Sequence, residues 1–423
     1  MQTHPVLGHV ALGYSPMIDR QRAVIATRLT VFPERPDAAP DARALLAALD
    51  EVWPNGAGAG GSLELTLRPL DPSAVGSRAA GAAPPATLNI AGEALLRAVM
   101  AAEPGPQMMV EIPAFMVTDP AHEAAIRALR AAGSVLLIKG RPLKPVPPDL
   151  LACFSHSIVD VSEERRDAVA PPPTGVRKVT TVQAGVRTTA DLEGAFQRGS
   201  VAVLGWTFDD PAPKPSVRAS VPSDVTVVME LIKGVEAEAP IARLEAIVKR
   251  DPTVGYRLMR YLNSPAFGLT TEINSFAHAL MLLGYRRLKR WLALLLASAS
   301  KDPNAKPYLY AAVRRGLLME ELGRSHADPD MRGEMFLCGV FSLLDRLLRQ
   351  PFAELLSAVP VPERVRLALV GEGGPHGPYL DLVRAMESES VIDIRECTER
   401  LLLSPADVNR ALLASLASAR QLD

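Results

Sequence analysis

The chain has 423 residues, of which 48% are hydrophobic and 22% charged, a balance that excludes a disordered protein and suits roughly two or three globular domains. Its 46 lysines and arginines balance 47 aspartates and glutamates, so it lacks the basic excess typical of nucleic-acid binders. Three isolated cysteines, no signal-peptide pattern and no apolar run near ~20 residues lead us to expect a cytoplasmic protein without membrane insertion.

The first half of the chain alternates short β-like runs with helical stretches. This alternation is typical of βα units, and consecutive apolar residues within the runs indicate strands that are buried on both faces. We therefore predict an α/β barrel of the TIM type over residues 1–210, although this length is short for eight complete βα units. The predicted strands are residues 63–67, 87–90, 108–112, 135–138, 157–161 and 201–204, and the clearest helices are 93–102 and 120–132.

A proline-rich stretch ends this first half. Residues 209–215 read Asp-Asp-Pro-Ala-Pro-Lys-Pro, and because proline fixes φ and removes backbone donors, we expect a semi-rigid linker over residues 211–221. Beyond it, apolar residues recur at a spacing of three to four. We predict an all-α domain over residues 222–423, with helices at 241–250, 252–262, 275–283, 285–299, 308–323, 334–348 and 405–419.

The helical half resembles the HDOD family. An Asp-Pro pair at the start of a helix precedes an Asn-Ser pair and a small aromatic turn, and a Leu-Gly turn and a tryptophan follow. The residues that carry the resemblance are Asp251, Pro252, Asn263, Ser264, Phe267, Gly284 and Trp291. Structural roles explain them: Asp251 can cap a helix that begins with Pro252, and the Asn-Ser pair can bond the backbone where that helix ends. A ligand-binding role is the alternative.

HDOD modules resemble the HD phosphohydrolases in fold but lack their metal-binding histidines and aspartates. The chain agrees with this pattern, because it has seven histidines and no His-Asp dipeptide. Without a metal to activate water, phosphohydrolase chemistry has no nucleophile. The resemblance therefore implies no catalytic residue, metal ligand or cofactor in this half.

A basic cluster follows the Leu-Gly turn. Four of five consecutive residues are positively charged, and their helical spacing around Leu288 and Trp291 predicts a solvated basic face. Binding of an acidic partner or a phosphate is the alternative. The cluster consists of Arg286, Arg287, Lys289 and Arg290.

The first half is similar to the EAL family of cyclic-di-GMP phosphodiesterases. Residues 14–19, Tyr-Ser-Pro-Met-Ile-Asp, resemble that family's first strand, and residues 88–96 resemble its asparagine-bearing strand and the following helix. Residues 182–192 and 203–208 resemble its last two strand ends. With the HDOD module, the resemblance implies a two-domain EAL–HDOD bacterial signalling protein, whose site would lie at the carboxyl ends of the barrel strands.

The chain departs from the EAL pattern at most of the positions that hold two divalent cations. Arg28 stands where the metal-binding glutamate of the signature belongs. Lys139 falls near the paired aspartates, Ile158 at the catalytic lysine, Ala184 and Arg187 at two late glutamates, and Leu204 at the final glutamine. Arg28 stays protonated, and Lys139 is expected to do so too, so both would repel a cation. The resemblance thus implies a degenerate EAL domain with no catalytic residue and no bound metal.

Binding of cyclic di-GMP without cleavage remains open. Arginines bind phosphate and guanine through planar, bidentate donors, and several basic residues could converge at the barrel mouth. Asn89, Glu111 and Asp160 stay at plausible ligand positions, or serve as hydrogen bonders at strand ends. The candidates for residual nucleotide binding are Arg28, Asn89, Glu111, Lys139, Arg141, Asp160 and Arg187.

The leading hypothesis is a non-catalytic scaffold or adaptor that acts through contacts with other bacterial signalling proteins. The first alternative is a receptor that binds cyclic di-GMP without hydrolysing it. The more remote alternative is an active cyclic-di-GMP phosphodiesterase.

Overall fold

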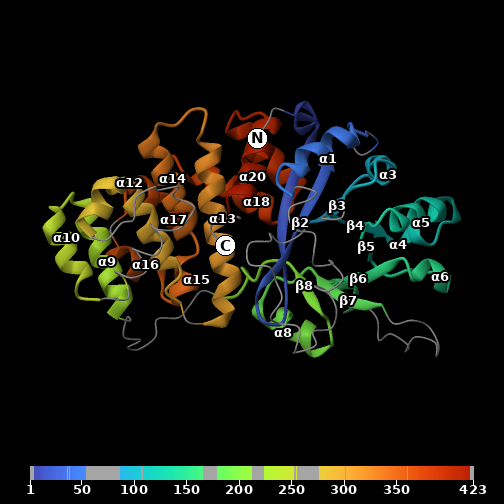
Figure 1. Ribbon diagram of the computed structural model, residues 1–423, viewed down its shortest axis with the longest axis horizontal. Helices are drawn as coiled ribbons and strands as arrows, with labels where there is room; N and C mark the ends of the chain where they lie inside the picture. Colours follow the sequence, from blue (N-terminus) through green and yellow to red (C-terminus); the bar gives the residue numbers. More distant parts are fainter. Residues whose placement is uncertain are drawn as a thin grey trace. The chain divides into compact units, whose positions relative to one another are not determined.

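The computed structural model describes most of the chain (Figure 1). The described residues are 4–35, 37, 39–53, 86–105, 108–164, 179–211, 223–251, 254, 276–300, 302–359 and 361–419. The predicted strand at 63–67, the predicted helix at 252–262 apart from Val254, and nearly all of the predicted linker lie outside them.

The chain divides into two compact units. The first combines Met1–Asp210 with Arg384–Ala417, and the second combines Pro211–Val383 with Ser418–Asp423. The first break falls where the sequence analysis placed the end of the barrel. The later segment differs, because the sequence analysis assigned residues 384–417 to the helical domain and the structure places them in the barrel unit.

The first unit contains a closed barrel of eight strands in sequential order, which confirms the predicted fold class. The second strand pairs with the first in antiparallel fashion, as does the eighth, whereas the other neighbours are parallel. The strands are β1 (Val10–Ile18), β2 (Val24–Pro33), β3 (Ala86–Ile90), β4 (Met108–Pro113), β5 (Leu136–Lys139), β6 (Phe154–Asp160), β7 (Thr180–Ala184) and β8 (Ala202–Leu204). Closure of the barrel thus needs fewer residues than we expected.

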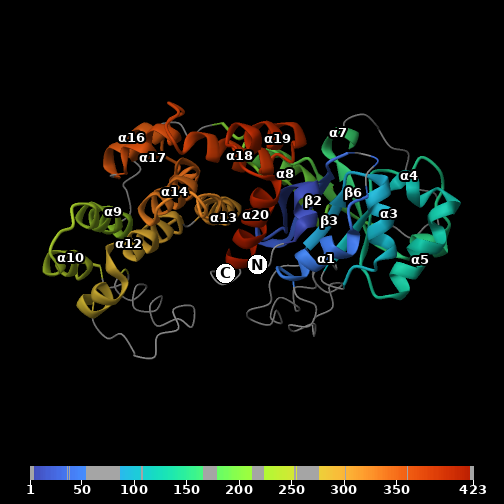
Figure 2. The same cartoon turned by 90° about the horizontal axis from the view of Figure 1, so that it is seen from above.

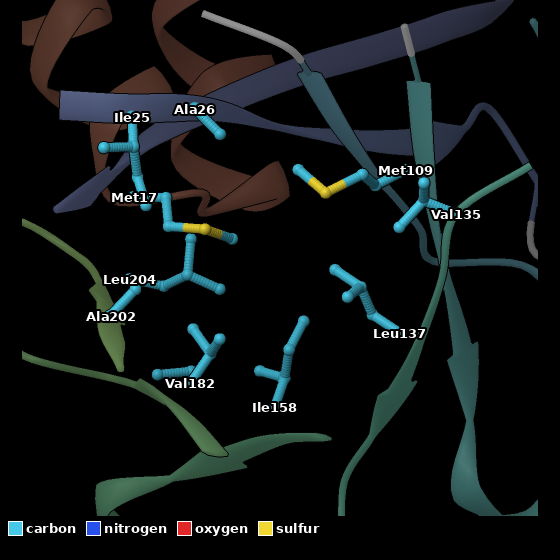
Figure 3. Close-up of a cluster of buried hydrophobic side chains, with 11 residues drawn as sticks. Met17, Ile25, Ala26, Met109, Val135, Leu137, Ile158, Val182, Ala202 and Leu204 are labelled. Carbon is cyan, nitrogen blue, oxygen red and sulfur yellow. The ribbon is translucent and has the colours of Figure 1, made fainter. Parts of the chain in front are cut away.

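Apolar side chains from every strand of the barrel except β3 fill part of its interior (Figure 3). Alternate residues of a strand point to opposite faces, so each strand contributes every second side chain to this interior. The cluster includes Met17, Ala26, Met109, Leu137, Ile158, Val182 and Leu204. Ile158, at the position of the family's catalytic lysine, is therefore a core residue that is 2% exposed.

Amphipathic helices cover the outside of the barrel. Asp41 and Thr188 cap two of them by accepting hydrogen bonds from backbone amides of the first turn. Among the described residues before 210, the helices are η1 (Pro5–His9), α1 (Ala42–Asp50), α3 (Glu93–Ala101), α4 (Ala114–Val117), η3 (Pro120–His122), α5 (Glu123–Ala131), α6 (Pro148–Leu151), α7 (Val161–Glu164) and α8 (Thr189–Gln197). The predictions at 93–102 and 120–132 are confirmed.

The C-terminal segment packs on the barrel through helices α19 (Val391–Arg400) and α20 (Pro405–Ala419). The amide nitrogen of the buried Asn409 donates to the carbonyls of Leu7 and Val10 at 2.8 and 2.7 Å, and its oxygen accepts from the amide of Leu12 at 3.1 Å. Helix α20, coloured red, lies beside the blue strand β2 in Figures 1 and 2. One side chain thus satisfies three backbone groups around the start of β1.

The second unit is helical, which confirms the predicted all-α architecture. Its helices are α9 (Ser223–Glu236), α10 (Ile241–Val248), α12 (Phe276–Ala297), η5 (Pro303–Ala305), α13 (Lys306–Leu322), α14 (Pro329–Phe341), α15 (Leu344–Leu348), α16 (Phe352–Ala358) and α17 (Glu363–Leu369). Helix α18 (Gly377–Glu387) contains the point at which the chain returns to the barrel unit. No helix among the described residues is long and apolar enough to cross a membrane.

Candidate functional site

A polar layer lies next to the apolar cluster inside the barrel. On β2, β4 and β5, the inward position two residues beyond an apolar cluster member carries a charged side chain, as in the pairs Ala26 and Arg28, Met109 and Glu111, and Leu137 and Lys139. This step runs toward the carboxyl ends of the strands. The sequence analysis placed the candidate site at this end of the barrel. The layer consists of Ser15, Arg28, Thr30, Thr87, Asn89, Glu111 and Lys139, and its members are joined by the hydrogen bonds described below.

Arg28 and Glu111 form a bidentate ion pair at the centre of this layer. The guanidinium donates from Nε to Oε1 at 2.9 Å and from Nη2 to Oε2 at 2.7 Å, and Thr87 donates to Oε1 at 3.0 Å. The Arg28 side chain is 11% exposed and that of Glu111 is 0% exposed. Both carboxylate oxygens of Glu111 therefore already accept hydrogen bonds.

A second carboxylate enters the layer from the C-terminal segment. Glu389 accepts a hydrogen bond from Ser15 at 2.6 Å and another from Thr30 at 2.8 Å, and it lies 3.6 Å from Nη1 of Arg28. Burial disfavours the charged form of Arg28, but the carboxylates of Glu111 and Glu389 outweigh this effect and raise its pKa above the ordinary arginine value. Arg28 is thus a permanent cation between two anions.

Lys139 begins a directed chain of hydrogen bonds. Its ammonium donates to the Asn89 oxygen at 2.7 Å, and the Asn89 amide donates to the Thr30 hydroxyl at 3.0 Å. Burial lowers the pKa of Lys139, and the nearby charge of Arg28 acts in the same direction, whereas Glu111 opposes it. Asn89 therefore uses its oxygen and its nitrogen within the protein.

The oxygens that would hold divalent cations are engaged by donors. Glu111 is paired with Arg28, and the Asn89 oxygen accepts from Lys139. Asp160, at the end of β6, accepts through one oxygen from the backbone amide of Ser162 at 2.8 Å and from its hydroxyl at 2.6 Å. A cation would have to displace these donors beside the guanidinium of Arg28, so these residues do not fit a two-metal site.

Two further residues of the predicted nucleotide-binding set lie in loops beyond the strand ends. Arg187, in the loop after β7, has a side chain that is 67% exposed and pairs with Asp209. Arg141 is a half-buried residue in the loop after β5. The structure therefore brings together Arg28, Asn89, Glu111 and Lys139, but Arg187 is directed to an exposed ion pair rather than to this group.

Comparison with known proteins identifies the helical unit. Residues 221–353 match the family described as HDOD domain. The chain contains an HDOD domain. Among curated proteins, it is 27% identical to the uncharacterized protein YuxH of Bacillus subtilis over 67% of this chain and 71% of that protein. It is 26% identical to the cyclic di-GMP phosphodiesterase CdgJ of Vibrio cholerae over 54% of this chain and 52% of that protein, so it spans about half the length of that relative.

Solved structures of EAL proteins also match part of the chain. A structure described as PaMucR phosphodiesterase in complex with c-di-GMP is 15% identical and matches 47% of this chain and 94% of its own, with a TM-score of 0.29. A calcium and cyclic-di-GMP complex of Klebsiella pneumoniae BlrP1 is 16% identical and matches 50% of this chain and 58% of its own, with a TM-score of 0.30.

The structure describes three of the residues that carried the HDOD resemblance. The carbonyl of Asp251 accepts from the amide of Val254 at 3.1 Å, Gly284 adopts a φ of 66° within α12, and Trp291 is buried with 4% exposure. The left-handed φ of Gly284 breaks the helix at the predicted Leu-Gly turn. The others lie outside the described residues: Pro252, Asn263, Ser264 and Phe267.

The basic cluster of the HDOD domain is not uniformly solvated. Arg286 and Arg287 are exposed, and Arg286 lies 3.0 Å from Asp330, whose side chain is 83% exposed. Lys289 is instead half-buried and lies 3.0 Å from Glu236. The expectation of a single solvated basic face is therefore wrong for the second half of the cluster.

Arg290 is the most extensively engaged member of this cluster. Its Nη1 donates to both oxygens of Glu320 at 2.8 and 2.6 Å, and its guanidinium lies 4.2 Å from the centre of the Phe336 ring. The turn of about 100° per residue carries this side chain away from the exposed face of α12 toward α13 and α14.

Three members of the polar layer, and the carboxylate of Glu389 that contacts it, were not predicted from the sequence. Thr30 and Thr87 lie two residues from Arg28 and Asn89 on the same strands, so alternation within an apolar run was a signal that could have found them. Ser15 lies in the segment that resembled the first EAL strand. Glu389 had no such signal, because it is separated from its hydrogen-bond partners by more than 350 residues.

Proposed function

We propose that this chain is a non-catalytic adaptor in bacterial signalling related to cyclic di-GMP. The observation that carries the proposal is the bidentate pair between Arg28 and Glu111, which occupies the centre of the barrel's polar layer. The similarity to the phosphodiesterase CdgJ and the presence of an HDOD domain support the signalling context.

The chemistry of phosphodiester cleavage argues for the loss of catalysis. Divalent cations activate water and stabilise the leaving oxygen when several free carboxylates converge on them. In this layer a guanidinium replaces one such ligand, and it neutralises the Glu111 carboxylate that remains. Arginine does not lose its proton at any working pH, so its repulsion of a cation is permanent.

An adaptor role leaves recognition to protein surfaces. The polar groups of the barrel interior satisfy one another, and we propose that the chain passes signals by binding other bacterial signalling proteins. The exposed members of the basic cluster, Arg286 and Arg287, are candidates for contact with an acidic partner surface.

Incubation of the full chain with cyclic di-GMP and excess Mg²⁺ or Mn²⁺ tests the loss of catalysis. We expect no linear dinucleotide above a control without protein, under conditions in which an active EAL phosphodiesterase gives complete conversion. Turnover by the wild type that disappears in Glu111→Ala and persists in Glu93→Ala, an exposed control, would refute the proposal.

A cyclic-di-GMP receptor is the second candidate, favoured by the two cations Arg28 and Lys139 in the polar layer. Calorimetric titration of the full chain separates the two functions. The adaptor proposal expects no binding heat up to ~100 µM nucleotide, a weak limit on the affinity scale. Stoichiometric micromolar binding that is lost in Lys139→Ala but kept in Lys144→Ala, an exposed control, would establish the receptor instead.

A further inference from the structure

Glu389 occupies a backbone position that ordinarily favours glycine. Helix α18 ends in a pair of hydrogen bonds, from the amide of Ser390 to the carbonyl of Ala385 and from the amide of Glu389 to the carbonyl of Met386, each 3.3 Å long. This Schellman pattern places its penultimate residue in the left-handed region, and Glu389 has a φ of 54°. A side chain there strains the backbone, and in Glu389 this strain accompanies a carboxylate that Ser15, Arg28 and Thr30 contact.

The barrel is shaped to receive this side chain. Gly13 on β1 lies so close that an added Cβ would sit 3.0 Å from the carbonyl oxygen of Met386 and 3.2 Å from Cγ of Glu389. Two residues along the same face of β1, Ser15 donates to the carboxylate. The absence of a side chain at position 13 thus gives the C-terminal segment room to approach the strand.

A chain of side-chain hydrogen bonds ends at the carboxylate of Glu389. Lys139 donates to Asn89, Asn89 donates to Thr30, and Thr30 donates to Glu389. Each donor in such a chain polarises the next, and the chain ends most favourably on an anion. The Ser15 hydroxyl donates to the same group and the Arg28 guanidinium lies 3.6 Å from it, so three groups from β1 and β2 converge on one carboxylate.

We propose that the mouth of the barrel is an oxyanion-binding site whose resident occupant is Glu389. The site is formed by Ser15, Arg28 and Thr30, and it takes a carboxylate or phosphate group of another molecule when the Glu389 side chain is withdrawn. Two hydroxyl donors and a nearby guanidinium match the oxygens of either group. Binding of an external oxyanion and occupation of the site by the Glu389 carboxylate are therefore mutually exclusive. The proposal goes beyond the adaptor function and does not depend on it.

Replacement of Glu389 by glycine tests whether the contacts of the carboxylate stabilise the chain by more than the backbone strain destabilises it. Glu389→Gly removes the backbone strain, so it should raise the melting temperature of the full chain if the carboxylate contributes nothing. The site proposed here predicts a fall of several degrees instead. Glu103→Gly is the matched control, because Glu103 is an exposed glutamate with a φ of 52° after α3 of the same unit. We expect that control to gain about 1–3 °C.

Added anions provide the second measurement. Sodium acetate and sodium phosphate, at ionic strength matched with sodium chloride, should raise the melting temperature of Glu389→Gly by about 2–4 °C at tenfold the dissociation constant. Rescue by either anion supports the site, and their ratio shows which oxyanion geometry it prefers. The wild type and Glu389→Gln, whose side chains fill the site, should show no rescue beyond chloride.

Two outcomes would overturn the proposal. A melting temperature for Glu389→Gly at or above that of the wild type would show that the carboxylate is dispensable. Equal effects of acetate, phosphate and chloride on the variant would show that no oxyanion site exists. If Glu389→Gly does not fold, Glu389→Gln is compared with Glu396→Gln, which changes an exposed glutamate on α19. The proposal requires Glu389→Gln to lower the melting temperature more than Glu396→Gln does. Equal changes in the melting temperature would overturn it.

Discussion

Arg28 in the barrel and Arg290 in the HDOD domain are both held by glutamates, but their surroundings differ. Arg28 faces the barrel interior between two carboxylates, and its main partner Glu111 is fully buried. Arg290 lies on a helix flank, with its side chain 33% exposed and its partner Glu320 28% exposed. A buried charge that loses its partner destabilises a protein far more than a charge that can turn to water. Loss of the glutamate partner should therefore destabilise the barrel unit more than the helical unit.

The difference also separates what each charge can do. The arginine in the barrel cannot leave its partners without exposing them to an apolar interior, so it serves as a fixed part of the site. On α12, the charges change from exposed at Arg286 and Arg287 to half-buried at Lys289 and Arg290. Only the exposed end of that cluster is free to meet a partner without disturbing the HDOD domain.

The largest effect is expected when the barrel pair is broken. Glu111→Ala leaves the guanidinium of Arg28 buried without its bidentate partner, and we expect the free energy of unfolding of the barrel unit to fall by about 3–5 kcal/mol. Glu93→Ala, which removes an exposed partner of Arg97, should cost less than about 1 kcal/mol.

Tryptophan fluorescence can report each unit separately during denaturation of the full chain. Two of the three tryptophans, Trp53 and Trp206, belong to the barrel unit, and the third, Trp291, belongs to the helical unit. In a chain that carries Trp291→Phe, the remaining fluorescence reports unfolding of the barrel unit. Both glutamate variants are therefore made in that chain. A loss below 1 kcal/mol for Glu111→Ala would mean that Arg28 finds water or another partner.

A smaller effect is expected in the HDOD domain. Arg290→Ala removes two charge-assisted hydrogen bonds and the contact with the Phe336 ring, and it should cost about 1–2 kcal/mol because Glu320 remains partly solvated. Arg287→Ala, on the exposed side of the same helix, should change stability by less than about 0.5 kcal/mol. Both are measured in a Trp53→Phe, Trp206→Phe background.

If Arg290→Ala and Arg287→Ala lowered the free energy of unfolding by equal amounts, the basic cluster would be uniformly solvated after all. Charge reversal sharpens the same comparison, since Arg290→Glu would place a second carboxylate beside that of Glu320, whereas Arg287→Glu would not. If Arg286 and Arg287 contact an acidic partner, their reversal should weaken that complex and leave the unfolding transition unchanged.

The barrel and the helical unit were predictable because their patterns are local. Strands with apolar residues on both faces, such as β4 and β8, and helices with three-to-four spacing, such as α10, follow from side-chain periodicity. The position of Arg28 on an inward face was also accessible, because its strand alternates. Neither α1 nor α8 was predicted, although Asp41 and Thr188 are N-cap signals at the starts of these two short helices.

The rest of the site depends on long-range contacts that periodicity does not encode. The carboxylate of Glu389 joins Ser15 and Thr30 across most of the chain, and the HDOD domain intervenes in the sequence. The half-buried state of Arg290 likewise depends on which helices pack against α12. The opposing charge at the barrel mouth and the position of Glu111 were predicted from the sequence, but the pairing of Glu111 with Arg28 and the presence of Glu389 required the structure.

The smallest effect concerns Lys139 and its dependence on pH. Burial lowers the pKa of this lysine and the charge of Arg28 acts in the same direction, so the folded state binds its proton more weakly than the unfolded chain, whose value is about 10.4. Between the lowered pKa and that value the unfolded state holds more protons, and the free energy of unfolding rises with pH. Lys139→Met removes this contribution. The stability of the wild type relative to the variant should therefore increase from pH 7 to pH 10.5, while Lys144→Met, at an exposed position, shows a constant difference. A constant difference for Lys139→Met as well would mean that its partners in the polar layer, Asn89 and the two carboxylates, fully compensate its burial.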